Sequence, residues 1–308
     1  MVDKFYKIES WCNKRFNNVA NYVCWHVLKS VLNITAPIYY KTHDIRRGQS
    51  CKKYVDEDVI ISMTTFPERL KTLPMVLESL FRQTVYPTKI ILWLANNQFT
   101  DKEAVKSFLM KYIKLGLEIR YCDDLRSHKK YYYTMKENPN ALVVTFDDDI
   151  FAPEDMLERL LITYTQYPNC IVTQRAHEMI IDKSGIPVPY NNWNRLAKDC
   201  KGPSRFLCAT GGAGCLYFPG ALSEHVFDKE AIKALCFQAD DIWLKCMSFL
   251  NGVEVVLTSE NNPEIIDIKD NKKNGLAKQN VEQGLNDIQL QAVSNYYGID
   301  WSKDYGSS

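Results

Sequence analysis

Two groups of aspartates in this chain have the residue types and the spacing to do chemistry. Asp147, Asp148 and Asp149 follow the apolar run "ALVVTF", and Asp240 and Asp241 lie some ninety residues later in "ADDIWLK". Three adjacent carboxylates repel one another unless a cation lies among them. Because successive side chains alternate across a strand, we expect Asp147 and Asp149 to share one face and Asp148 to point the other way. Hard divalent cations prefer carboxylate oxygens, so the first group predicts a site for Mg²⁺ or Mn²⁺.

Both groups also have a purely structural interpretation. A helix is predicted to begin near Pro153, and Asp240 and Asp241 open another predicted helix. Carboxylates at such positions cap free backbone amides and interact favourably with the helix dipole. Either group alone is compatible with helix capping. The presence of both favours a catalytic role over helix capping.

The elements that must position these residues alternate along the chain. Apolar runs predict buried strands at 59–65, where β-branched residues are frequent, and at 89–95. Further strands are predicted at 117–122, 141–146, 170–176, 215–218 and 253–258. Spacing of three to four predicts helices at 68–84, 101–116, 127–138, 153–167, 238–252 and 285–298. Such alternation is typical of βαβ units and a parallel sheet. Ligands of such sheets bind beyond the carboxyl ends of the strands, where the first aspartate group is expected.

The first 57 residues are predicted to form an amphipathic helical extension with a connector, ahead of a main domain at 58–308. Apolar residues recur every three or four positions from Phe5 to Val31. Residues 1–53 contain ten Lys and Arg against three Asp and Glu, a net charge of +7, whereas the remainder carries −6. One interpretation is that residues 1–35 bind an anionic membrane surface. The other is that the helix packs on the main domain.

Composition narrows the class of protein. Hydrophobic residues make up 46% of the 308 residues and charged residues 24%, which is ordinary for a globular protein. The ten cysteines are scattered without a C-x-x-C pair, which favours a reducing, cytoplasmic location. No run of 18 apolar residues and no export signal is present, so we expect neither a membrane span nor secretion. The basic residues match no nucleic-acid recognition motif, and nucleic-acid binding is not expected.

Five motifs, in order, resemble those of nucleotide-sugar-dependent glycosyltransferases of the GT-A fold, closest to family-2-like enzymes of bacterial polysaccharide assembly. The motifs, which cover roughly Val59 to Asp287, are "SMTTFPERL", "SLFRQTVYPTKIILWLA", "TFDDDIFAPEDML", "TGGAGCLYFP" and "ADDIWLK". The resemblance implies a Rossmann-like α/β fold with a mostly parallel sheet flanked by helices. It also implies Mn²⁺- or Mg²⁺-dependent transfer, with inversion, from a nucleotide sugar, for which UDP is favoured. The acceptor would be a saccharide or a lipid-linked saccharide at the cytoplasmic membrane face.

The resemblance also implies roles for single residues. Asp241 stands at the position of the general base, with Asp240 beside it. Asp147 would bind the nucleotide and the metal, Asp149 the metal, and Asp148 would support nucleotide binding. The remaining nucleotide-binding positions would be Thr64, Thr65 and Arg69 at the end of the first strand, and Asp124, Lys129 and Lys130 after the third.

Two further features are predicted from the residues themselves. Glycine lets a backbone approach a ligand closely, so Gly211 and Gly212 in "TGGAG" are expected near the donor sugar or the acceptor. Trp193 in "YNNWN" has a ring that suits stacking on a sugar face. A tryptophan buried in the core is the alternative for that residue.

The sequence departs from the family pattern in two places, and other functions remain open. The last of its five histidines is His225, where relatives often carry a later histidine on the metal, so Asn286 and Asp287 or water would substitute. Strand 89–95 runs into "NN", where relatives often carry an aspartate that reads uracil. A sugar nucleotidyltransferase is one alternative, although "TTFPERL" lacks the glycine-rich loop such an enzyme needs. A non-catalytic, metal-dependent carbohydrate-binding module is the other.

Overall fold

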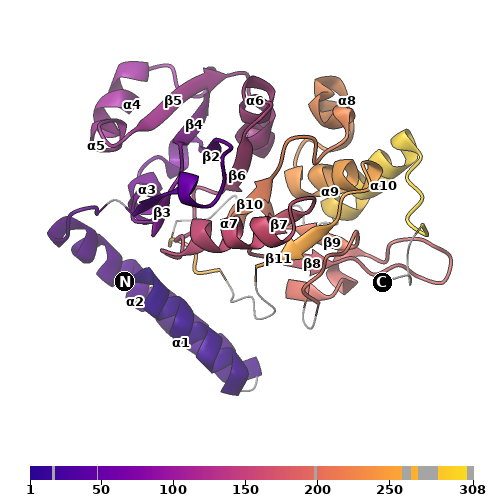
Figure 1. Ribbon diagram of the computed structural model, residues 1–308, viewed down its shortest axis with the longest axis horizontal. Coiled ribbons are helices and arrows are strands. Elements are labelled where there is room, and N and C mark those ends of the chain that lie inside the picture. Colours follow the sequence, from indigo (N-terminus) through magenta and orange to yellow (C-terminus); the bar gives the residue numbers. More distant parts are fainter. Residues whose placement is uncertain (16–17, 47, 198–199, 259–264, 270–283, 304–308) are drawn as a thin grey trace.

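A seven-stranded sheet forms the centre of the computed structural model, which describes residues 1–15, 18–46, 48–197, 200–258, 265–269 and 284–303 (Figure 1). The strand order is β11-β7-β10-β6-β2-β4-β5. Strand β10 is antiparallel to both its neighbours, and every other neighbouring pair in this sheet is parallel. The strands are β2 (Val59–Thr64), β4 (Lys89–Ala95), β5 (Leu117–Cys122), β6 (Leu142–Phe146), β7 (Ile171–Thr173), β10 (Cys215–Tyr217) and β11 (Val255–Leu257). The predicted α/β fold with a mostly parallel sheet is confirmed.

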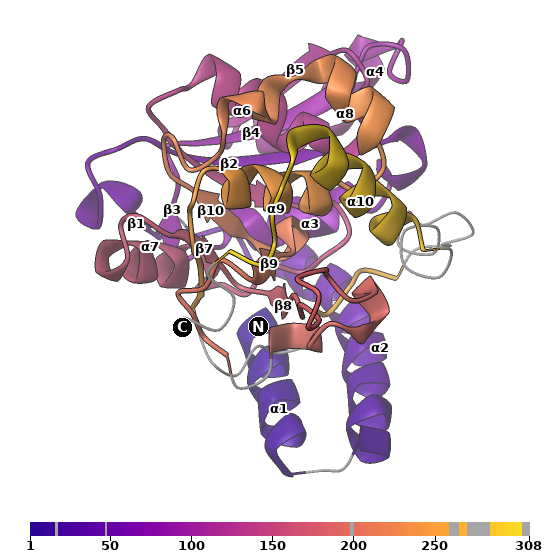
Figure 2. The same ribbon diagram turned by 90° about the vertical axis from the view of Figure 1, so that its right-hand side faces the viewer.

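Helices cover both faces of this sheet (Figures 1 and 2). Their bounds are α3 (Leu73–Phe81), α4 (Lys102–Phe108), α5 (Met110–Ile113), α6 (Lys129–Glu137), α7 (Met156–Gln166), α8 (Lys229–Leu235), α9 (Asp240–Leu250) and α10 (Leu285–Tyr297). Single turns of 3₁₀ helix lie at η1 (Cys51–Lys53), η2 (Pro67–Arg69), η3 (Arg126–His128), η4 (Tyr190–Asn192), η5 (Arg195–Ala197), η6 (Gly211–Ala213) and η7 (Glu224–Phe227). The predicted helix 68–84 is therefore a 3₁₀ turn followed by α3, whose first turn contains Pro74.

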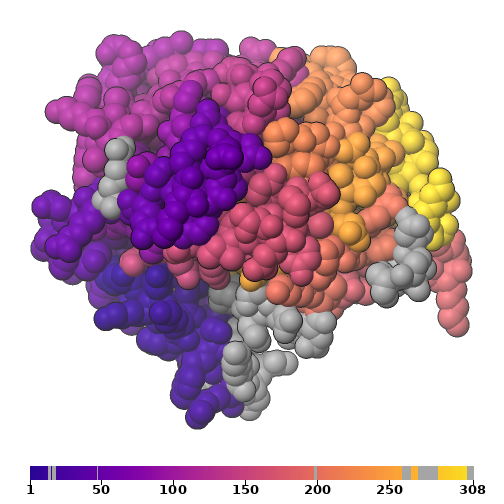
Figure 3. Space-filling model, viewed as in Figure 1, coloured from indigo at the N-terminus to yellow at the C-terminus, as the bar shows by residue number. Residues whose placement is uncertain are grey.

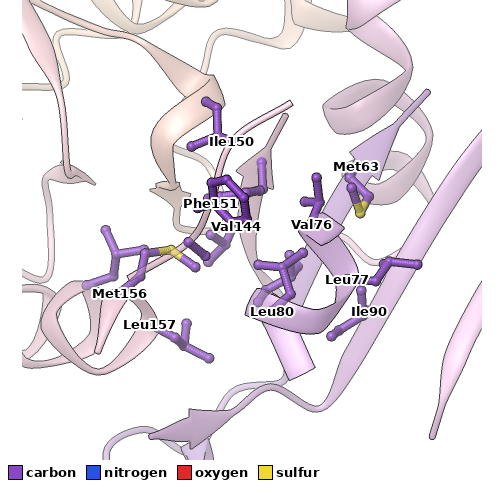
Figure 4. Packing of buried hydrophobic residues seen from close by; sticks show 14 of the residues in the cluster. Met63, Val76, Leu77, Leu80, Ile90, Val144, Ile150, Phe151, Met156 and Leu157 are labelled. Carbon is purple, nitrogen blue, oxygen red and sulfur yellow. The ribbon is translucent and has the colours of Figure 1, made fainter. Parts of the chain in front are cut away.

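The core lies between these helices and the sheet. Neighbouring strand residues face opposite ways, so Ile61 joins one buried cluster and Ile60 another. On the first face, Val76, Leu77 and Leu80 of α3 pack beside side chains of the strands and of the segment that leads to α7 (Figure 4). On the other side of the molecule, α6, α8, α9 and α10 share a second large cluster. The strand ends are thus held by packing on both faces.

Two pairs of short strands lie outside the central sheet. Strand β1 (Gln49–Ser50) pairs in parallel with β3 (Val85–Tyr86), and β8 (Ala176–Glu178) pairs antiparallel with β9 (Leu207–Ala209). The sequence predicted one strand at 170–176, whereas the chain forms β7 and then β8 in a separate sheet. It predicted neither β9 nor helix α8.

Helices α1 (Val2–Arg15) and α2 (Asn18–Thr42) form a hairpin that stands out from the body (Figures 2 and 3). Its inner side contributes Tyr6, Leu32 and Tyr40 to the main buried cluster. The Tyr6 hydroxyl also donates to the carbonyl of Phe151 at 2.8 Å. Among the described residues, no helix combines the length and the hydropathy that crossing a lipid bilayer requires. The contacts of Tyr6, Leu32 and Tyr40 show that part of the hairpin packs on the body. The predicted domain boundary between residues 57 and 58 remains a prediction.

Candidate active site

The predicted site segments follow strands that end at the same edge of the sheet. Met63 pairs with Phe146, and Ala95 pairs with Cys122, so the carboxyl ends of β2, β6, β4 and β5 lie side by side. Strand β6 ends at Phe146, and the three aspartates that follow lie in a turn rather than in the strand itself. Asp147 and Asp149 are half-buried there and Asp148 is buried.

Lys130 joins the two acidic groups. Its Nζ donates to Asp147 Oδ1 at 2.7 Å and lies 2.9 Å from Asp240 Oδ2. The side chain of Lys130 is only 2% exposed, so water screens this charge weakly. Burial alone would lower the pKa of Lys130, but Asp147 and Asp240 hold it well above its ordinary value. Two carboxylates far apart in the sequence therefore share one buried ammonium group.

The glycine loop closes around the same carboxylates. The Gly211 amide donates to Asp241 Oδ1 at 2.8 Å, and the Asp147 amide donates to the Gly212 carbonyl at 3.0 Å. The buried hydroxyl of Thr145 donates to the Gly211 carbonyl at 2.9 Å. A Cβ atom on Gly212 would lie 2.0 Å from Asp147 Oδ2, a distance that real atoms do not adopt. Glycine is therefore required at position 212 for the loop to approach Asp147.

The pKa values of Asp240 and Asp241 are displaced in opposite directions. Burial alone would raise the pKa of Asp240, but the Lys130 charge outweighs burial and lowers it. Burial, with the neighbouring Asp240 charge, raises the pKa of Asp241 to about 7. Pairs of acids separated in this way are typical of sites that divide acid and base roles. Lys130 therefore favours the ionised form of Asp240, whereas burial favours the protonated form of Asp241.

Arg69 forms a second cationic centre at this edge. Its Nη1 donates to Asp148 Oδ1 at 2.6 Å, and its Nη2 lies 3.0 Å from Asp149 Oδ2. The Thr65 hydroxyl donates to the other oxygen of Asp148. Burial raises the pKa of Asp148 to about 6, although Arg69 opposes this rise. Asp148 and Asp149 thus share Arg69, whereas Asp147 meets Lys130. This differs from the expectation that Asp147 and Asp149 lie together on one face, because the strand ends at Phe146 and its alternation does not continue through the turn.

The other predicted nucleotide-binding residues lie along the same edge with partners of their own. Lys129 Nζ donates to Asp124 Oδ1 at 2.5 Å, whereas the adjacent Lys130 reaches Asp147. Burial alone would raise the pKa of Asp124, and Lys129 lowers it. The Thr64 hydroxyl donates to the Trp93 carbonyl of the neighbouring strand at 2.9 Å. The structure therefore separates the two adjacent lysines into two ion pairs.

Trp193 has a different environment from the one predicted. It is only 5% exposed, belongs to the second large cluster, and donates its ring N–H to the Val188 carbonyl at 2.9 Å. Its ring also packs at 4.7 Å from that of Tyr190. No ring face is left for a sugar, so the stacking prediction is corrected: Trp193 is a core residue.

A divalent cation would have two carboxylates available here. Among the described residues, no group of three or more His, Cys, Asp or Glu side chains forms a complete metal site. Asp287, one substitute for the missing histidine, accepts from the Tyr190 amide at 2.7 Å. Mg²⁺ is commonly held by one or two carboxylates, with substrate phosphates and water completing its coordination. Asp147 and Asp149 are the carboxylates that could act in this mode, and a cation there would replace their ion pairs with Lys130 and Arg69.

Sequence reasoning missed the bridging position of Lys130 and the contribution of Thr145. Lys130 was predicted to approach the nucleotide, but its contact with both acidic groups depends on where α6 begins. Thr145 directly precedes Phe146, the last residue of β6. Its only signal in the sequence is its polarity within an apolar run. A cavity of about 580 Å³ lies elsewhere, between the end of α2 and helices α3 and α5, and none of the predicted site residues lines it.

Comparisons with known proteins give a distant likeness. No protein-family model and no curated protein sequence matches this chain. Among solved structures, it is similar to mannosyltransferase PcManGT from Pyrobaculum calidifontis in complex with GDP-Man and Mn²⁺. The identity is 13% and the TM-score 0.49, over 88% of this chain and 75% of that one.

It is also similar to S. aureus TarS 1–349 in complex with UDP. The identity is 13% and the TM-score 0.41, over 65% of this chain and 57% of that one. This chain therefore matches somewhat more than half the length of the TarS chain. At such identities, the function has to be argued from the residues of this chain.

We predict that Gly212→Ala lowers the turnover measured in the donor assay described under Proposed function more than Gly211→Ala does. The new methyl group at 212 would displace the Asp147 carboxylate, whereas at 211 it would lie 3.0 Å from Thr145 Oγ1 and 3.2 Å from Asp241 Oδ1. Misplacing a catalytic group by about 1 Å costs on the order of 10²-fold in rate. Turnover of both variants, beside thermal unfolding to confirm folding, measures the difference. Equal activity of the two variants would contradict the close approach.

Proposed function

We propose that this protein is a metal-dependent, inverting glycosyltransferase that moves a sugar from a nucleotide sugar to a hydroxyl group of a saccharide or lipid-linked saccharide. The observation that carries the proposal is the Lys130 bridge, which brings Asp147 and Asp240 to one buried cation beside Gly211 and Gly212. Helix capping alone would not require two distant acidic groups to meet. Their meeting at the carboxyl edge of a parallel sheet is what a donor site in this fold class needs.

Asp241 has the properties of a general base. Its pKa of about 7 lets it accept a proton at neutral pH and release it again. The Gly211 amide fixes one carboxylate oxygen at 2.8 Å, which leaves the other oxygen to meet an acceptor hydroxyl. As Asp241 takes the hydroxyl proton, the acceptor oxygen would bond to the anomeric carbon from the face opposite the diphosphate. The bond between the anomeric carbon and the diphosphate oxygen breaks, the nucleoside diphosphate leaves, and the product has the inverted anomeric configuration. Asp240, ionised beside Lys130, is a positioning residue for this arrangement.

Cations at the edge of the sheet suit a diphosphate leaving group. Lys130 and Arg69 place two fixed positive charges beside the aspartate turn. In this proposal Asp147 and Asp149 would hold Mn²⁺ or Mg²⁺, and the ion would supply further positive charge beside the diphosphate. Thr64, Thr65 and Arg69 line the end of β2 and would contact the nucleotide, with Asp124 and Lys129 contributing from the end of β5. UDP is the favoured nucleotide, and a cytoplasmic location at a membrane face is part of the proposal.

A donor assay tests this function. Purified protein with Mn²⁺ and a panel of UDP- and GDP-sugars is expected to release nucleoside diphosphate, and EDTA should remove this activity. Asp149→Asn should lower the activity about 10²-fold or more because it removes a metal ligand. Asp155→Asn is the matched control, since it changes a half-buried aspartate that pairs with Arg159 in the same segment. Proton NMR of the product reports whether the anomeric configuration is inverted.

Three outcomes would overturn the proposal. Undiminished activity in EDTA, or in Asp149→Asn, would remove the metal from the mechanism. Release of pyrophosphate from a nucleoside triphosphate and a sugar phosphate would identify a nucleotidyltransferase. Calorimetric binding of a saccharide without any binding of nucleotide would identify a carbohydrate-binding module.

A further inference from the structure

The outer side of α2 carries a row of exposed apolar side chains. We call this row the α2 outer face, and its residues are Val19, Tyr22, Val23, Val27, Val31, Ile34 and Ile38. These side chains are between 42% and 74% exposed, and a spacing of three or four places them along one side of the helix. Leu28, Leu32 and Ala36 on the opposite side are buried. Packing on the body therefore accounts for only one side of α2.

The hairpin presents this face away from the body of the protein. Helices α1 and α2 project together beyond the sheet and its covering helices (Figures 2 and 3). Ile8 and Trp11 of α1 are about half exposed as well, at 47% and 50%. The Arg15 guanidinium lies over the Trp11 ring at 5.0 Å. Exposed apolar surface of this extent on a protruding element indicates a binding surface.

The hairpin has more basic than acidic residues, and its two acidic residues face the body. Helix α2 contains no acidic residue, and Asp3 and Glu9 are the acidic residues that precede Asp44 in the sequence. Glu9 is buried, and Asp3 accepts from the Glu154 amide. The exposed cations among the described side chains of the hairpin are Lys4, Lys7, Arg15 and Lys41. Just beyond the hairpin, exposed Asp44 and Arg46 carry opposite charges. A partner of this surface must therefore be apolar and anionic at once.

We propose that the α2 outer face binds an anionic phospholipid surface, with α2 lying in the plane of the interface. Valine, isoleucine and tyrosine side chains would enter the headgroup and acyl boundary while the lysines contact lipid phosphates. A symmetric contact between this face and the same face of a second copy is disfavoured as the occupant because it would bring cations against cations. A spanning helix is disfavoured because no described helix is apolar enough.

The hairpin is tied to the aspartate turn, so membrane binding would also orient the candidate site. Asp267 accepts from Asn33 Nδ2 of α2 through its carbonyl at 3.1 Å, and its carboxylate pairs with Lys29 at 2.5 Å. The next residue, Ile268, donates its amide to the Asp149 carbonyl at 2.7 Å. A surface bound by α2 would therefore lie at a fixed position relative to the aspartates. This orientation suits an acceptor attached to lipid, a consequence that rests on the proposed function, whereas lipid binding itself does not.

Vesicle sedimentation of the full chain tests the proposal. Wild-type protein is expected to sediment with vesicles of equal parts phosphatidylcholine and phosphatidylglycerol, and much less with phosphatidylcholine alone. The triple variant Val23→Ser, Val27→Ser and Ile34→Ser should lower the bound fraction about tenfold or more. Serine has nearly the same helix propensity as valine and isoleucine, so the helix should persist, which circular dichroism checks.

A matched control removes the same kind of side chain from other surfaces. Ile162→Ser, Ile186→Ser and Ile288→Ser alter exposed isoleucines outside the hairpin, and this variant should sediment like the wild type. An equal loss of vesicle binding in both triple variants would overturn the proposal, because binding would then be non-specific hydrophobic adsorption. Absence of wild-type sedimentation, or a dimer in analytical ultracentrifugation that only the α2 variant dissociates, would also overturn it. Donor turnover without vesicles should be the same in both variants, so failure of lipid binding and failure of the proposed function are distinguishable.

Discussion

Replacing Asp241 with asparagine is expected to lower kcat for sugar transfer by about 10²- to 10⁴-fold, the usual contribution of a general base. Asparagine has nearly the same shape as aspartate and can still accept the Gly211 amide hydrogen bond through its side-chain oxygen. It cannot take up the proton of an acceptor hydroxyl. The affinity for nucleotide, measured by calorimetry, should therefore stay close to that of the wild type while kcat falls.

The pH profile separates this role from a structural one. Asp241 must be ionised to act as a base, and burial raises its pKa to about 7. Wild-type kcat/KM should therefore fall as the pH drops below about 7, by about tenfold per unit once the carboxyl is mostly protonated. The residual activity of Asp241→Asn should lack this dependence.

Asp228→Asn is the matched control for the Asp241 variant. Asp228 caps α8 by accepting the Ala231 amide, and asparagine caps a helix about as well as aspartate. This control should keep both the wild-type rate and its pH profile. Full activity of Asp241→Asn, or an unchanged acidic limb in its profile, would show that another group is the base.

The sequence predicted the central fold well because its strands are continuous apolar runs. β2, β4 and β6 are buried on both faces, and each is a nearly continuous hydrophobic stretch. The edge strand β5 is only half-buried and includes Glu118 and Arg120, so its signal in the sequence is weaker. The strands of the outer sheet were not predictable in the same way. β8 and β9 have three residues each, too few for any periodicity to show. Helix α8 did carry a usable signal, because Asp228 is a favourable N-cap residue.

The site was predictable in composition but not in pairing. Two acidic groups at the starts of loops and helices can be identified from local spacing alone. That Lys130 rather than Lys129 reaches Asp147 depends on the rotation of about 100° between adjacent helical residues, and hence on the residue at which α6 begins. The pairing of Arg69 with Asp148 and Asp149 joins segments that only the tertiary fold brings together. Trp193 could be assigned to the core only once its burial was known.

Replacing Lys130 with methionine is expected to have the largest effect on stability. Methionine fills a similar volume without the charge, so the change leaves Asp147 and Asp240 without the ammonium group they share. Breaking a buried ion pair typically costs 3–5 kcal/mol. Asp147 keeps 39% of its side chain exposed and is partly stabilised by water, whereas Asp240 is only 10% exposed. We therefore expect a loss near the lower end, about 3 kcal/mol in the free energy of unfolding, measured by urea denaturation.

A double variant identifies the cause of this loss. Lys130→Met leaves two carboxylates without a cation, and Asp240→Asn removes one of those two. The double variant should therefore lose less free energy of unfolding than the sum of the losses in the two single variants. Lys136→Met, an exposed position on the same helix, is the matched control and should change stability by less than about 0.5 kcal/mol. Additive effects of Lys130→Met and Asp240→Asn would mean that the ammonium group does not couple to Asp240. We expect strong coupling between the Lys130 and Asp240 changes, together with loss of sugar transfer in Lys130→Met. Both results follow if the one buried charge of Lys130 holds the glycine loop in place and also keeps Asp240 ionised beside the proposed base, Asp241.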